Sequence, residues 1–532
     1  MPLEATRLDR ASATSTRAAL AAALLFVGLA LFGARYHWVE EAGTAERDGY
    51  VGQAEQLLEG ELPKDPFRPP LYPLLAAGLG GAIGDPFAAA RLISNLAAAA
   101  LAWIAWRTGR ELGGGLPRQA SPPVPLAKGG EGKTASAAET IGAWAFAATA
   151  VNPNLWILGQ HATTDMTFGA LAAGALLAGL TYLKRPGALP ASVAGALLGL
   201  AAFTRGNAIF LLPALLLAFF LAGPPFGSRW RHLLYGGLSA LPGYAALWTW
   251  RYATFGEPFR DDNWKNVAWK LYGYPDWSYL DRVPFHGLGE IARTDPLGIL
   301  KGGLSELVRF AESGLAQLVG TPLHAVLFVV AGIWLLRRKD RAAAWLLCAG
   351  LVFLAATAFS FFTWGRLLLC LLPAASAITF AALFPPGFQP PPVRKLALGV
   401  AAVLVLSLGA KTAFRRLPAF VDRHPYLEVT TLRRIENELP PGTRLGGTSP
   451  FLGRYLTHLY VSLPDAFGPE LRDPGLYLEK LERLVRDERI SYLVIGELDL
   501  RDRPKELLGP KPPAPWLVPV EKGSTISVWR VR

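Results

Sequence analysis

Two aspartates at the edges of apolar segments are the residues best suited to acid–base chemistry. Asp48 stands in Glu46-Arg-Asp-Gly-Tyr, and Asp165 stands in His161-Ala-Thr-Thr-Asp, where an apolar segment begins. A carboxylate beside hydrocarbon is costly unless it has a partner or a wet cavity, so its presence suggests a function. Asp48 is suited to accepting a proton from an incoming hydroxyl group. Each aspartate could instead cap a helix N-terminus, as could Thr164.

Four arginines border the same apolar segments and are suited to holding an anion. Arg205 lies in Thr204-Arg-Gly-Asn and Arg366 follows Thr363-Trp-Gly, while Arg68 precedes two prolines and Arg251 follows Trp250. Guanidinium groups bind phosphate through paired N–H bonds. Each arginine could also simply extend its charged group from hydrocarbon to water.

Carboxylates beside arginines fit one kind of reaction, the transfer of a group from a phosphate-linked lipid. A carboxylate takes the proton of the acceptor, and arginines stabilise the charge that develops on the departing phosphate. Because the lipid tail needs an apolar surrounding, such an enzyme is expected inside a membrane.

The composition indicates a membrane protein with a soluble part. The chain has 532 residues, 52% hydrophobic and 18% charged, with a mean hydropathy of +0.28. Ordinary soluble proteins carry about a quarter charged residues. The net charge of +12 does not indicate nucleic-acid binding, because the cations stand mainly at the ends of apolar runs. Cys348 and Cys370 both lie in apolar segments, so a disulfide framework is not expected.

Apolar segments predict a mainly α, polytopic helical membrane protein with about eleven spans. They are 18–34, 87–106, 139–158, 166–183, 190–204, 207–222, 233–250, 322–336, 342–362, 367–384 and 396–411. The segment 69–84 is either a short further span or a helix lying at the membrane interface.

Positive charge favours the second interpretation of residues 69–84. If this segment does not cross, the basic residues 1–17 and all clustered cations of the alternate connections face one side. These cations are Arg107, Arg110, Arg118, Lys128, Lys133, Lys184, Arg185, Arg229, Arg231, Arg337, Arg338, Lys339, Arg341, Arg394 and Lys395. The positive-inside rule then predicts a cytoplasmic N-terminus and an extracytoplasmic C-terminus.

The predicted organisation has a membrane domain at 18–411 and an extracytoplasmic α/β domain at 412–532. The outer loops are 35–86 and 251–321, and 108–138 is a cytoplasmic linker, rich in Gly and Pro over 113–133. In the first outer loop, an amphipathic helix is predicted to begin just after Asp48. In the C-terminal domain, 432–439 and 476–487 are predicted helices, 492–495 a buried strand and 527–531 an edge strand.

The order of these motifs resembles the GT-C superfamily of membrane glycosyltransferases. The first two motifs are Asp48-x-Tyr50-x3-Ala54-x2-Leu57-x2-Gly60 and Arg68-Pro-Pro-Leu-Tyr-Pro. Then follow Thr164-Asp165-Met-Thr-Phe, Gly195-x3-Gly199-Leu-Ala-Ala-Phe-Thr-Arg205-Gly-Asn, Arg251-Tyr-x2-Phe-Gly256-Glu-Pro, and Arg366 before a Leu-rich span with Pro373. The most similar branch is the bacterial protein-mannosyltransferase and aminoarabinose-transferase type, which is like glycosyltransferase family 39.

The resemblance implies transfer of a sugar, with inversion, from a polyprenyl-phosphate donor on the periplasmic side of a bacterial inner membrane. Asp48 is implied as the base and Asp165 as the second acidic residue, with Arg205, Arg366, Arg68 and Arg251 as candidates for binding the donor phosphate. The acceptor could be a protein, a lipid or a glycan, and a need for a divalent cation stays open.

Three departures from the family pattern affect these assignments. Gly206 stands where Pro is usual after the arginine, Leu367 stands where Tyr is usual, and the Glu common near Arg68 is absent. Glu40 and Glu41 are therefore alternatives to Asp48. The competing function is a carrier or flippase of lipid-linked sugar or another anion, in which the arginines line a vestibule. The odd number of predicted spans, the lack of evident repeats and the large outer domain all count against the carrier hypothesis.

Overall fold

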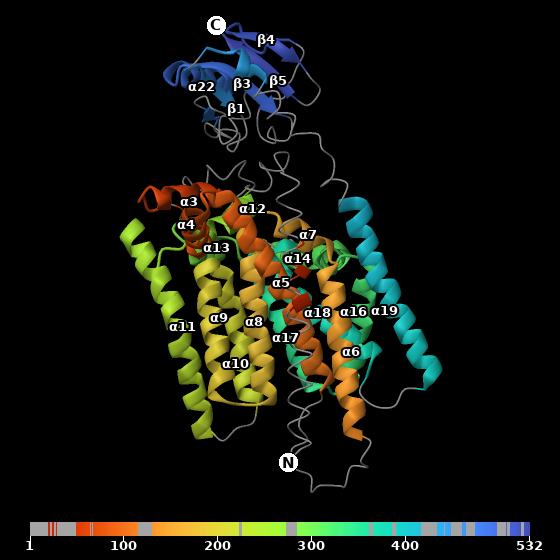
Figure 1. The fold of residues 1–532 in the computed structure, drawn as a ribbon. Helices are drawn as coiled ribbons and strands as arrows, with labels where there is room; N and C mark the ends of the chain where they lie inside the picture. The colour runs from red at the N-terminus through yellow and green to blue at the C-terminus, as the bar shows by residue number, and fades with distance from the viewer. Residues whose placement is uncertain are drawn as a thin grey trace. The chain divides into compact units, whose positions relative to one another are not determined.

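The computed structural model places the chain in two compact units (Figure 1), each described separately here. Unit 1 comprises residues 1–35, 49–263 and 300–419, and unit 2 comprises 36–48, 264–299 and 420–532. The structure describes residues 20–21, 24–25, 28, 49–63, 65, 67–114, 130–222, 226–272, 285–360, 365–385, 390–416, 434–440, 442–447, 460–463, 474–496, 507, 511–522 and 526–532. Most of the predicted span 18–34, Asp48, Glu40 and Glu41 lie outside these residues. Unit 2 includes 264–299, which differs from the predicted boundary near 412.

Helices account for most of the described residues of unit 1. Nine of the eleven predicted apolar segments are helical over nearly all of their described residues, and a tenth, 139–158, is divided between two helices. The first helices are α3 (Tyr50–Leu58), α4 (Leu71–Ile83), α5 (Pro86–Gly113), α6 (Gly130–Ala150), α7 (Pro153–Gly159), α8 (Thr164–Lys184) and α9 (Ala188–Thr204). Then follow η1 (Gly206–Leu211), α10 (Leu212–Leu221), α11 (Phe226–Phe255), α14 (Pro296–Arg309, which begins in unit 2), η4 (Phe310–Gly314), α15 (Leu315–Val319), α16 (Pro322–Arg337), α17 (Arg341–Phe359), η5 (Gly365–Leu371), α18 (Leu372–Leu383), α19 (Pro391–Lys411) and η6 (Thr412–Arg416). Because α5 ends at 113 and α6 begins at 130, helical structure extends into the predicted linker.

Five helices among the described residues are long and apolar enough to cross a bilayer by themselves. They cover 86–113, 164–184, 341–359, 365–383 and 391–414, and the pair formed by 296–319 and 322–337, bent by 105°, makes a sixth if counted as one span. Other segments are shorter apolar helices, such as Ala188–Thr204 and Gly206–Leu221.

The predicted segment 139–158 is wrong as a continuous helix. The chain breaks after Ala150, and α7 starts anew at Pro153. The side chain of Asn152 accepts a hydrogen bond from the backbone N–H of Asn154, which caps α7. A proline at the first helical position and an asparagine cap before it start a new helix rather than continuing an old one.

Helix α4 does not cross the bundle, as the charge pattern predicted for residues 69–84. Its 13 residues extend only about 20 Å. Both of its ends contact the first turns of α5, since Gly80 lies against Pro86 and the Tyr72 hydroxyl donates to the carbonyl oxygen of Ala90.

Glycines allow α9 and α11 to pack backbone against backbone. A Cβ atom added at Gly195 would lie 1.9 Å from the carbonyl oxygen of Gly236, and one at Gly199 would lie 2.3 Å from that of Ala240. Such small-residue seams are a common way for membrane helices to associate. The seam fixes α9, whose last residue directly precedes Arg205.

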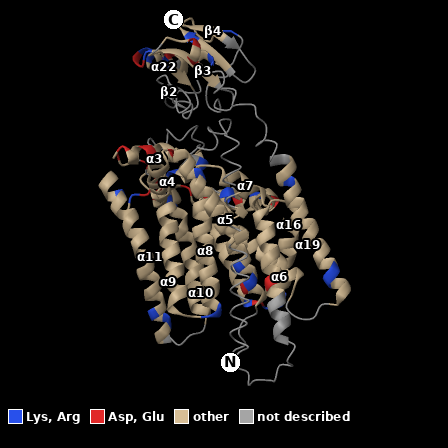
Figure 2. Cartoon of the chain, viewed as in Figure 1, with Lys and Arg blue, Asp and Glu red and all other residues tan. Residues whose placement is uncertain are grey.

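The ends of the helical unit differ in charge, as Figure 2 shows. We call the end at which α5, α8, α16 and η5 begin the site end, and the other the opposite end. The described members of the predicted cation clusters lie toward the opposite end, near the ends of α5, α8 and α16 and near the starts of α11, α17 and α19.

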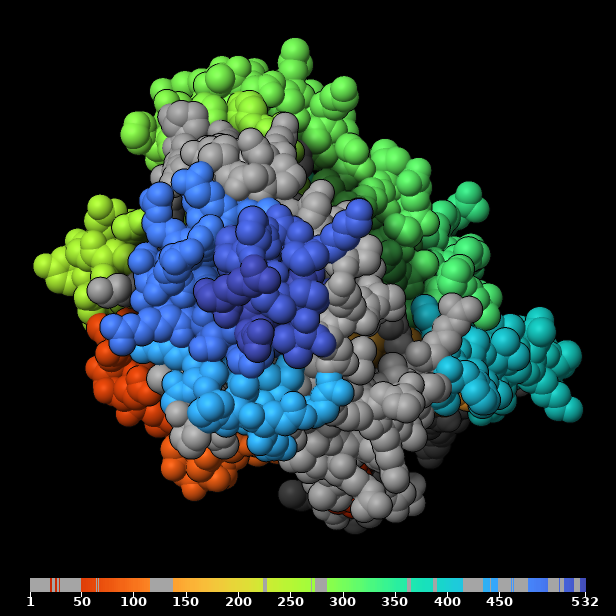
Figure 3. Space-filling model, turned by 90° about the horizontal axis from the view of Figure 1, so that it is seen from above, coloured from red at the N-terminus to blue at the C-terminus, as the bar shows by residue number. Residues whose placement is uncertain are grey.

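Unit 2 contains a small five-stranded sheet with strand order β2-β1-β3-β5-β4. Its elements are β1 (Arg444–Gly447), β2 (Tyr460–Ser462), α22 (Pro474–Asp487), β3 (Ile490–Gly496), β4 (Leu517–Lys522) and β5 (Ile526–Val531). Strand β1 pairs in parallel with β2 and β3, whereas β5 pairs antiparallel with β3 and β4. In Figure 3, α22 and strands β3 to β5 form one continuous blue body.

The predicted buried strand at 492–495 and the helix at 476–487 are confirmed, and residues 434–438 of the other predicted helix are helical. The prediction of an edge strand at 527–531 is wrong, because β5 lies between β3 and β4. Val528 and Trp529 are fully buried, and the Trp529 indole N–H donates to the carbonyl oxygen of Leu507. Unit 2 also contains α12 (Lys265–Tyr272) and α13 (Leu288–Thr294) in the second predicted outer loop.

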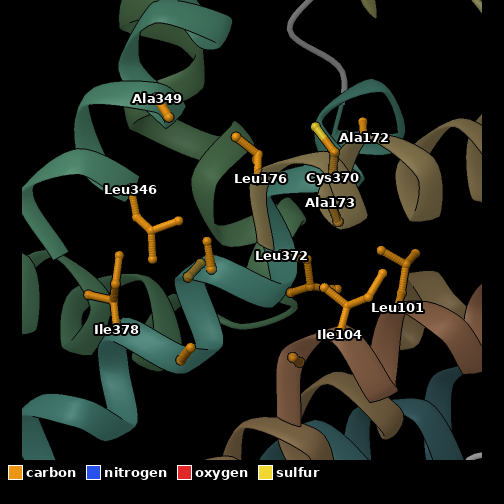
Figure 4. Close-up of a cluster of buried hydrophobic side chains, with 14 of the residues drawn as sticks. Leu101, Ile104, Ala172, Ala173, Leu176, Leu346, Ala349, Cys370, Leu372 and Ile378 are labelled. Atoms are coloured by element: carbon orange, nitrogen blue, oxygen red, sulfur yellow. The ribbon is translucent and has the colours of Figure 1, made fainter. Parts of the chain in front are cut away.

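A dense apolar core lies between α5, α8, α17 and α18 (Figure 4). Leu101, Phe168, Phe353 and Leu372 are almost completely buried in it. Close packing of this kind transmits small changes in side-chain volume. The close-packed core therefore fixes the positions of the helices whose ends carry the polar residues.

A buried carboxylate between two arginines

Asp165 lies at the site end and contacts two arginines from distant parts of the chain. Its Oδ1 is 2.8 Å from a terminal guanidinium nitrogen of Arg205, and its Oδ2 is 3.5 Å from one of Arg366. The Thr163 hydroxyl donates to Oδ2 at 3.1 Å. The Asp165 side chain is fully buried, while those of Arg205 and Arg366 are 13% and 22% exposed. The carboxylate is thus enclosed, and each arginine keeps a path to the surface.

The helix-capping explanation for Asp165 is wrong. The N-cap of α8 is Thr163, which makes no side-chain capping bond, and Asp165 is the second residue of the helix. Its charge lies at the positive end of the helix dipole, where a carboxylate is stabilised. Simple extension into water does not describe Arg205 and Arg366 either, because both contact this buried carboxylate.

The two arginines stand on similar local structures. Arg205 is the extended residue that ends α9 and precedes the 3-10 helix η1, which runs into α10 with Pro213 near its start. Arg366 is the second residue of the 3-10 helix η5, which runs into α18 with Pro373 near its start. Each arginine therefore begins a helical segment whose free N–H groups point toward the site end.

Arg68 belongs to a neighbouring group of side chains in the connection between α3 and α4. Asp65 accepts hydrogen bonds from the backbone N–H groups of Phe67 and Arg68 and from the Gln53 amide. The Arg68 guanidinium lies 2.6 Å from the same carboxylate. This turn fixes Arg68, whose side chain is 29% exposed.

A hydrogen bond joins this group to the start of α8. The Tyr50 hydroxyl lies 3.0 Å from the Thr164 hydroxyl, beside Asp165 in the sequence. Helix α3, as predicted, begins directly after Asp48 and Gly49. Its N-cap is Gly49, with φ of +71°. The alternative in which Asp48 caps a helix concerns a residue outside the part of the chain that the structure describes.

Side chains of α5 hold the loop that leads into α8. The Ser94 hydroxyl donates to the carbonyl oxygen of His161, and the Gln160 amide is held between Arg91 and Asn95. All four of the polar residues Arg91, Ser94, Asn95 and Gln160 are buried. Buried polar networks whose members are hydrogen-bonded fix a single arrangement.

A second polar corner lies beside Arg366. The carbonyl oxygens of residues 317–320 are hydrogen-bonded by the side chains of Asn154, Asn152, His324 and Lys411. The backbone of Gly365 packs on this corner, since an added Cβ would lie 3.4 Å from the backbone nitrogen of Leu318. The corner therefore supports the residue before Arg366.

Arg251 joins the site end through a loop that follows α11. Its guanidinium lies 3.5 Å from Asp261, which also binds the Asn263 amide. The side chains of Asp261 and Asn263 each lie 3.5 Å from the position that a Cβ would take at Gly206, the residue after Arg205. A Cβ at this position would make only ordinary van der Waals contact with the loop, so packing here does not require the glycine that departs from the family pattern.

The predicted site residues are brought together to different degrees. Asp165, Arg205 and Arg366 are in direct contact, whereas Arg68 and Arg251 pair with Asp65 and Asp261 at the same end of unit 1. The sequence analysis missed the roles of Tyr50, Asp65 and the α5 side chains. Asp65 has a local signal, because an aspartate three residues before Arg68 commonly forms such a turn. Within the described segments, no three His, Cys, Asp or Glu residues are grouped so as to hold a metal.

Two solved structures of ArnT from Cupriavidus metallidurans are similar to this chain. The apo state is 13% identical, with coverage of 95% of this chain and 97% of the other and a TM-score of 0.50. The form bound to undecaprenyl phosphate is 14% identical over the same shares, with a TM-score of 0.52. No protein-family model and no curated protein sequence matches the chain. The chain therefore has a polytopic helical membrane fold like that of these two ArnT structures, and it also contains a small sheet.

Proposed function

We propose that this protein is an integral-membrane glycosyltransferase that moves a sugar from a polyprenyl-phosphate donor to an acceptor hydroxyl or similar group. The observation that carries the proposal is the buried Asp165 in contact with Arg205 and Arg366, on a GT-C fold. The binding of undecaprenyl phosphate by the similar ArnT structure supports a polyprenyl phosphate as the lipid.

The proposed reaction is a single displacement with inversion. The acceptor oxygen forms a bond to the anomeric carbon, the bond from that carbon to the phosphate oxygen breaks, and its electron pair stays on the phosphate. Asp48 takes the proton of the acceptor, because a carboxylate is ionised at neutral pH. Arg205 and Arg366 stabilise the charge on the departing phosphate, with Arg68 and Arg251 completing the positive surround.

Asp165 is proposed to position the arginines rather than to accept the proton. Its side chain has no exposed surface, and both oxygens are already engaged by positively charged groups. A carboxylate in this setting is a weak base, because its charged form is stabilised. Each guanidinium has five N–H donors, so a contact with Asp165 leaves others for a phosphate.

The site is proposed to face the extracytoplasmic side. The clustered cations of the described helices lie at the opposite end, and such clusters favour the cytoplasm. A site on the outer face suits a lipid-linked sugar as donor, because the tail can remain among the helices.

The experiment uses the full-length protein in nanodiscs with a panel of radiolabelled polyprenyl-phosphate sugars. Release of labelled sugar and its transfer to a membrane extract are followed for wild type and Asp48→Asn. The control is Asp340→Asn, because Asp340 caps α17 at the opposite end through its side-chain oxygen. We expect Asp48→Asn to lose turnover while lipid binding persists, and Asp340→Asn to keep both.

The carrier hypothesis gives a different result in the same assay. A carrier binds and moves the intact lipid without cleavage, alike in wild type and Asp48→Asn. That outcome would overturn the enzyme proposal. Equal turnover in both proteins would instead remove Asp48 as the base and direct attention to Glu40 and Glu41.

A further inference from the structure

We propose that Tyr50 is a positioning residue that sets the spacing between Arg68 and the pair formed by Arg205 and Arg366, so that all three guanidiniums bind one lipid phosphate. This inference rests on the proposed function and adds to it a residue that touches neither sugar nor phosphate. In the sequence, Tyr50 stands only as one position of the motif that begins at Asp48.

The Tyr50 hydroxyl makes a direct contact between α3 and α8. Tyr50 is the first residue of α3 and Thr164 the first residue of α8, and their hydroxyl oxygens are 3.0 Å apart. The side chains are deeply buried, since Tyr50 is 2% exposed and Thr164 has no exposed surface. A buried hydroxyl pair in this setting is costly to break, because the separated groups lose a partner in a place without water.

The ring of Tyr50 faces Arg68. The guanidinium carbon of Arg68 lies 5.8 Å from the ring centre, within the range of a cation–π contact. The Tyr72 ring meets the Tyr50 ring edge to face, at 5.5 Å between centres. The Tyr50 ring therefore contacts both Arg68 and Tyr72, while its hydroxyl lies against that of Thr164.

The two contacts connect parts of the site that the chain does not connect locally. Arg68 belongs to the turn after α3, while Thr164 directly precedes Asp165, which holds Arg205 and Arg366. A single phosphate can be bound by all three arginines only if these two parts keep a fixed distance. Tyr50 contacts both parts, so its hydroxyl bond is placed to keep that distance.

The bond can be tested with isosteric changes in the full-length protein. Tyr50→Phe removes only the hydroxyl, and Thr164→Val replaces the other hydroxyl by a methyl group. The probe is a polyprenyl monophosphate without sugar, bound to wild type, both single variants and the double variant in nanodiscs. Tyr182→Phe is the matched control, because this fully buried tyrosine also makes one hydroxyl bond, 3.0 Å to His232 Nδ1, far from the site end.

We expect each single variant to bind the phosphate about tenfold more weakly than wild type, and the double variant to be no weaker than either single one. Tyr182→Phe should bind like wild type even if its melting temperature falls. Wild-type affinity in Tyr50→Phe, or additive losses in the double variant, would overturn the inference and leave the proposed function standing. A wild-type protein that neither binds the phosphate nor transfers sugar would overturn both.

Discussion

Ion pairs lie at both ends of the helical unit, and they differ in burial. At the opposite end, Arg110 pairs with Glu139 at 2.8 Å, and Arg107 and Arg185 contact Glu111. Each of these side chains has some exposed surface. At the site end, by contrast, the Asp165 carboxylate has none, and it contacts both Arg205 and Arg366.

The opposite end follows from general rules of membrane proteins. Arg110, Lys184 and Arg337 lie in last turns of helices, where cations interact favourably with the helix dipole, and cation clusters at helix ends are typical of membrane proteins. The site end does not follow from those rules. Arg366 stands at the start of a helical segment, where a cation is unfavourable, and Asp165 is buried. The difference suggests that the site-end charges are kept for a ligand.

The largest effect is expected from removing the shared carboxylate. Asp165→Asn keeps the size of the side chain but leaves Arg205 and Arg366 without their common counter-charge. Breaking a buried ion pair costs about 3–5 kcal/mol, so transfer should fall by at least about 100-fold and the melting temperature should drop. The measurements are initial transfer rate and thermal unfolding in detergent.

Glu139→Gln is the matched control at the opposite end, where Glu139 pairs with Arg110. We expect its transfer rate to stay within about twofold of wild type, because rim charges away from a site contribute little. If both variants lost activity equally, the contrast between the two ends would be wrong.

The next effect separates the two arginines of the site. Lysine keeps the charge but cannot give paired N–H bonds, so Arg205→Lys and Arg366→Lys should both weaken phosphate binding. Arg205 lies at 2.8 Å from Asp165 and Arg366 at 3.5 Å, so we expect about 100-fold and about tenfold losses of kcat/KM, respectively. The donor concentration dependence of the transfer rate gives both values.

Arg110→Lys is the control for this pair, since its contact with Glu139 is also 2.8 Å. It should retain the wild-type kcat/KM. A loss in Arg110→Lys as large as that in Arg205→Lys would show that the distance of an ion pair, rather than its place in the molecule, decides the effect.

A smaller effect is expected from the helices that connect the two ends. Gly199→Ala would place a Cβ 2.3 Å from the carbonyl oxygen of Ala240, so α9 and α11 must move apart. Overpacking of this kind costs about 1–3 kcal/mol. Thermal unfolding should show a lower melting temperature for Gly199→Ala. The control Gly237→Ala should keep the wild-type melting temperature, because nothing lies within 4 Å of a Cβ at Gly237. Equal melting temperatures would mean that the seam does not hold α9.

The sequence predicted much of the helical unit because hydrophobicity and charge are local signals. The segments 166–183 and 190–204 lie within α8 and α9, and residues 69–84 were rightly kept from crossing. It could not predict that Asp165 meets both Arg205 and Arg366, because those contacts depend on how distant helices pack. The prediction of an edge strand at 527–531 was wrong because the place of a strand in a sheet also depends on partners that are distant in the sequence. Its partner β4 carries Pro519, which hides a strand from pattern analysis.

The smallest effect is expected at Arg185, which tests whether an exposed ion pair at the opposite end contributes little. Arg185 contacts Glu111, but its side chain is 61% exposed. An exposed ion pair contributes about 0.2–1 kcal/mol, because water screens it and the long side chain loses freedom. Arg185→Ala should therefore leave transfer unchanged and lower stability by less than about 1 kcal/mol, a loss that shrinks further in high salt. Asp165→Asn should lose activity at any salt concentration, because its pair is buried. If the salt dependence of the two variants were the same, burial would not be what distinguishes the site end.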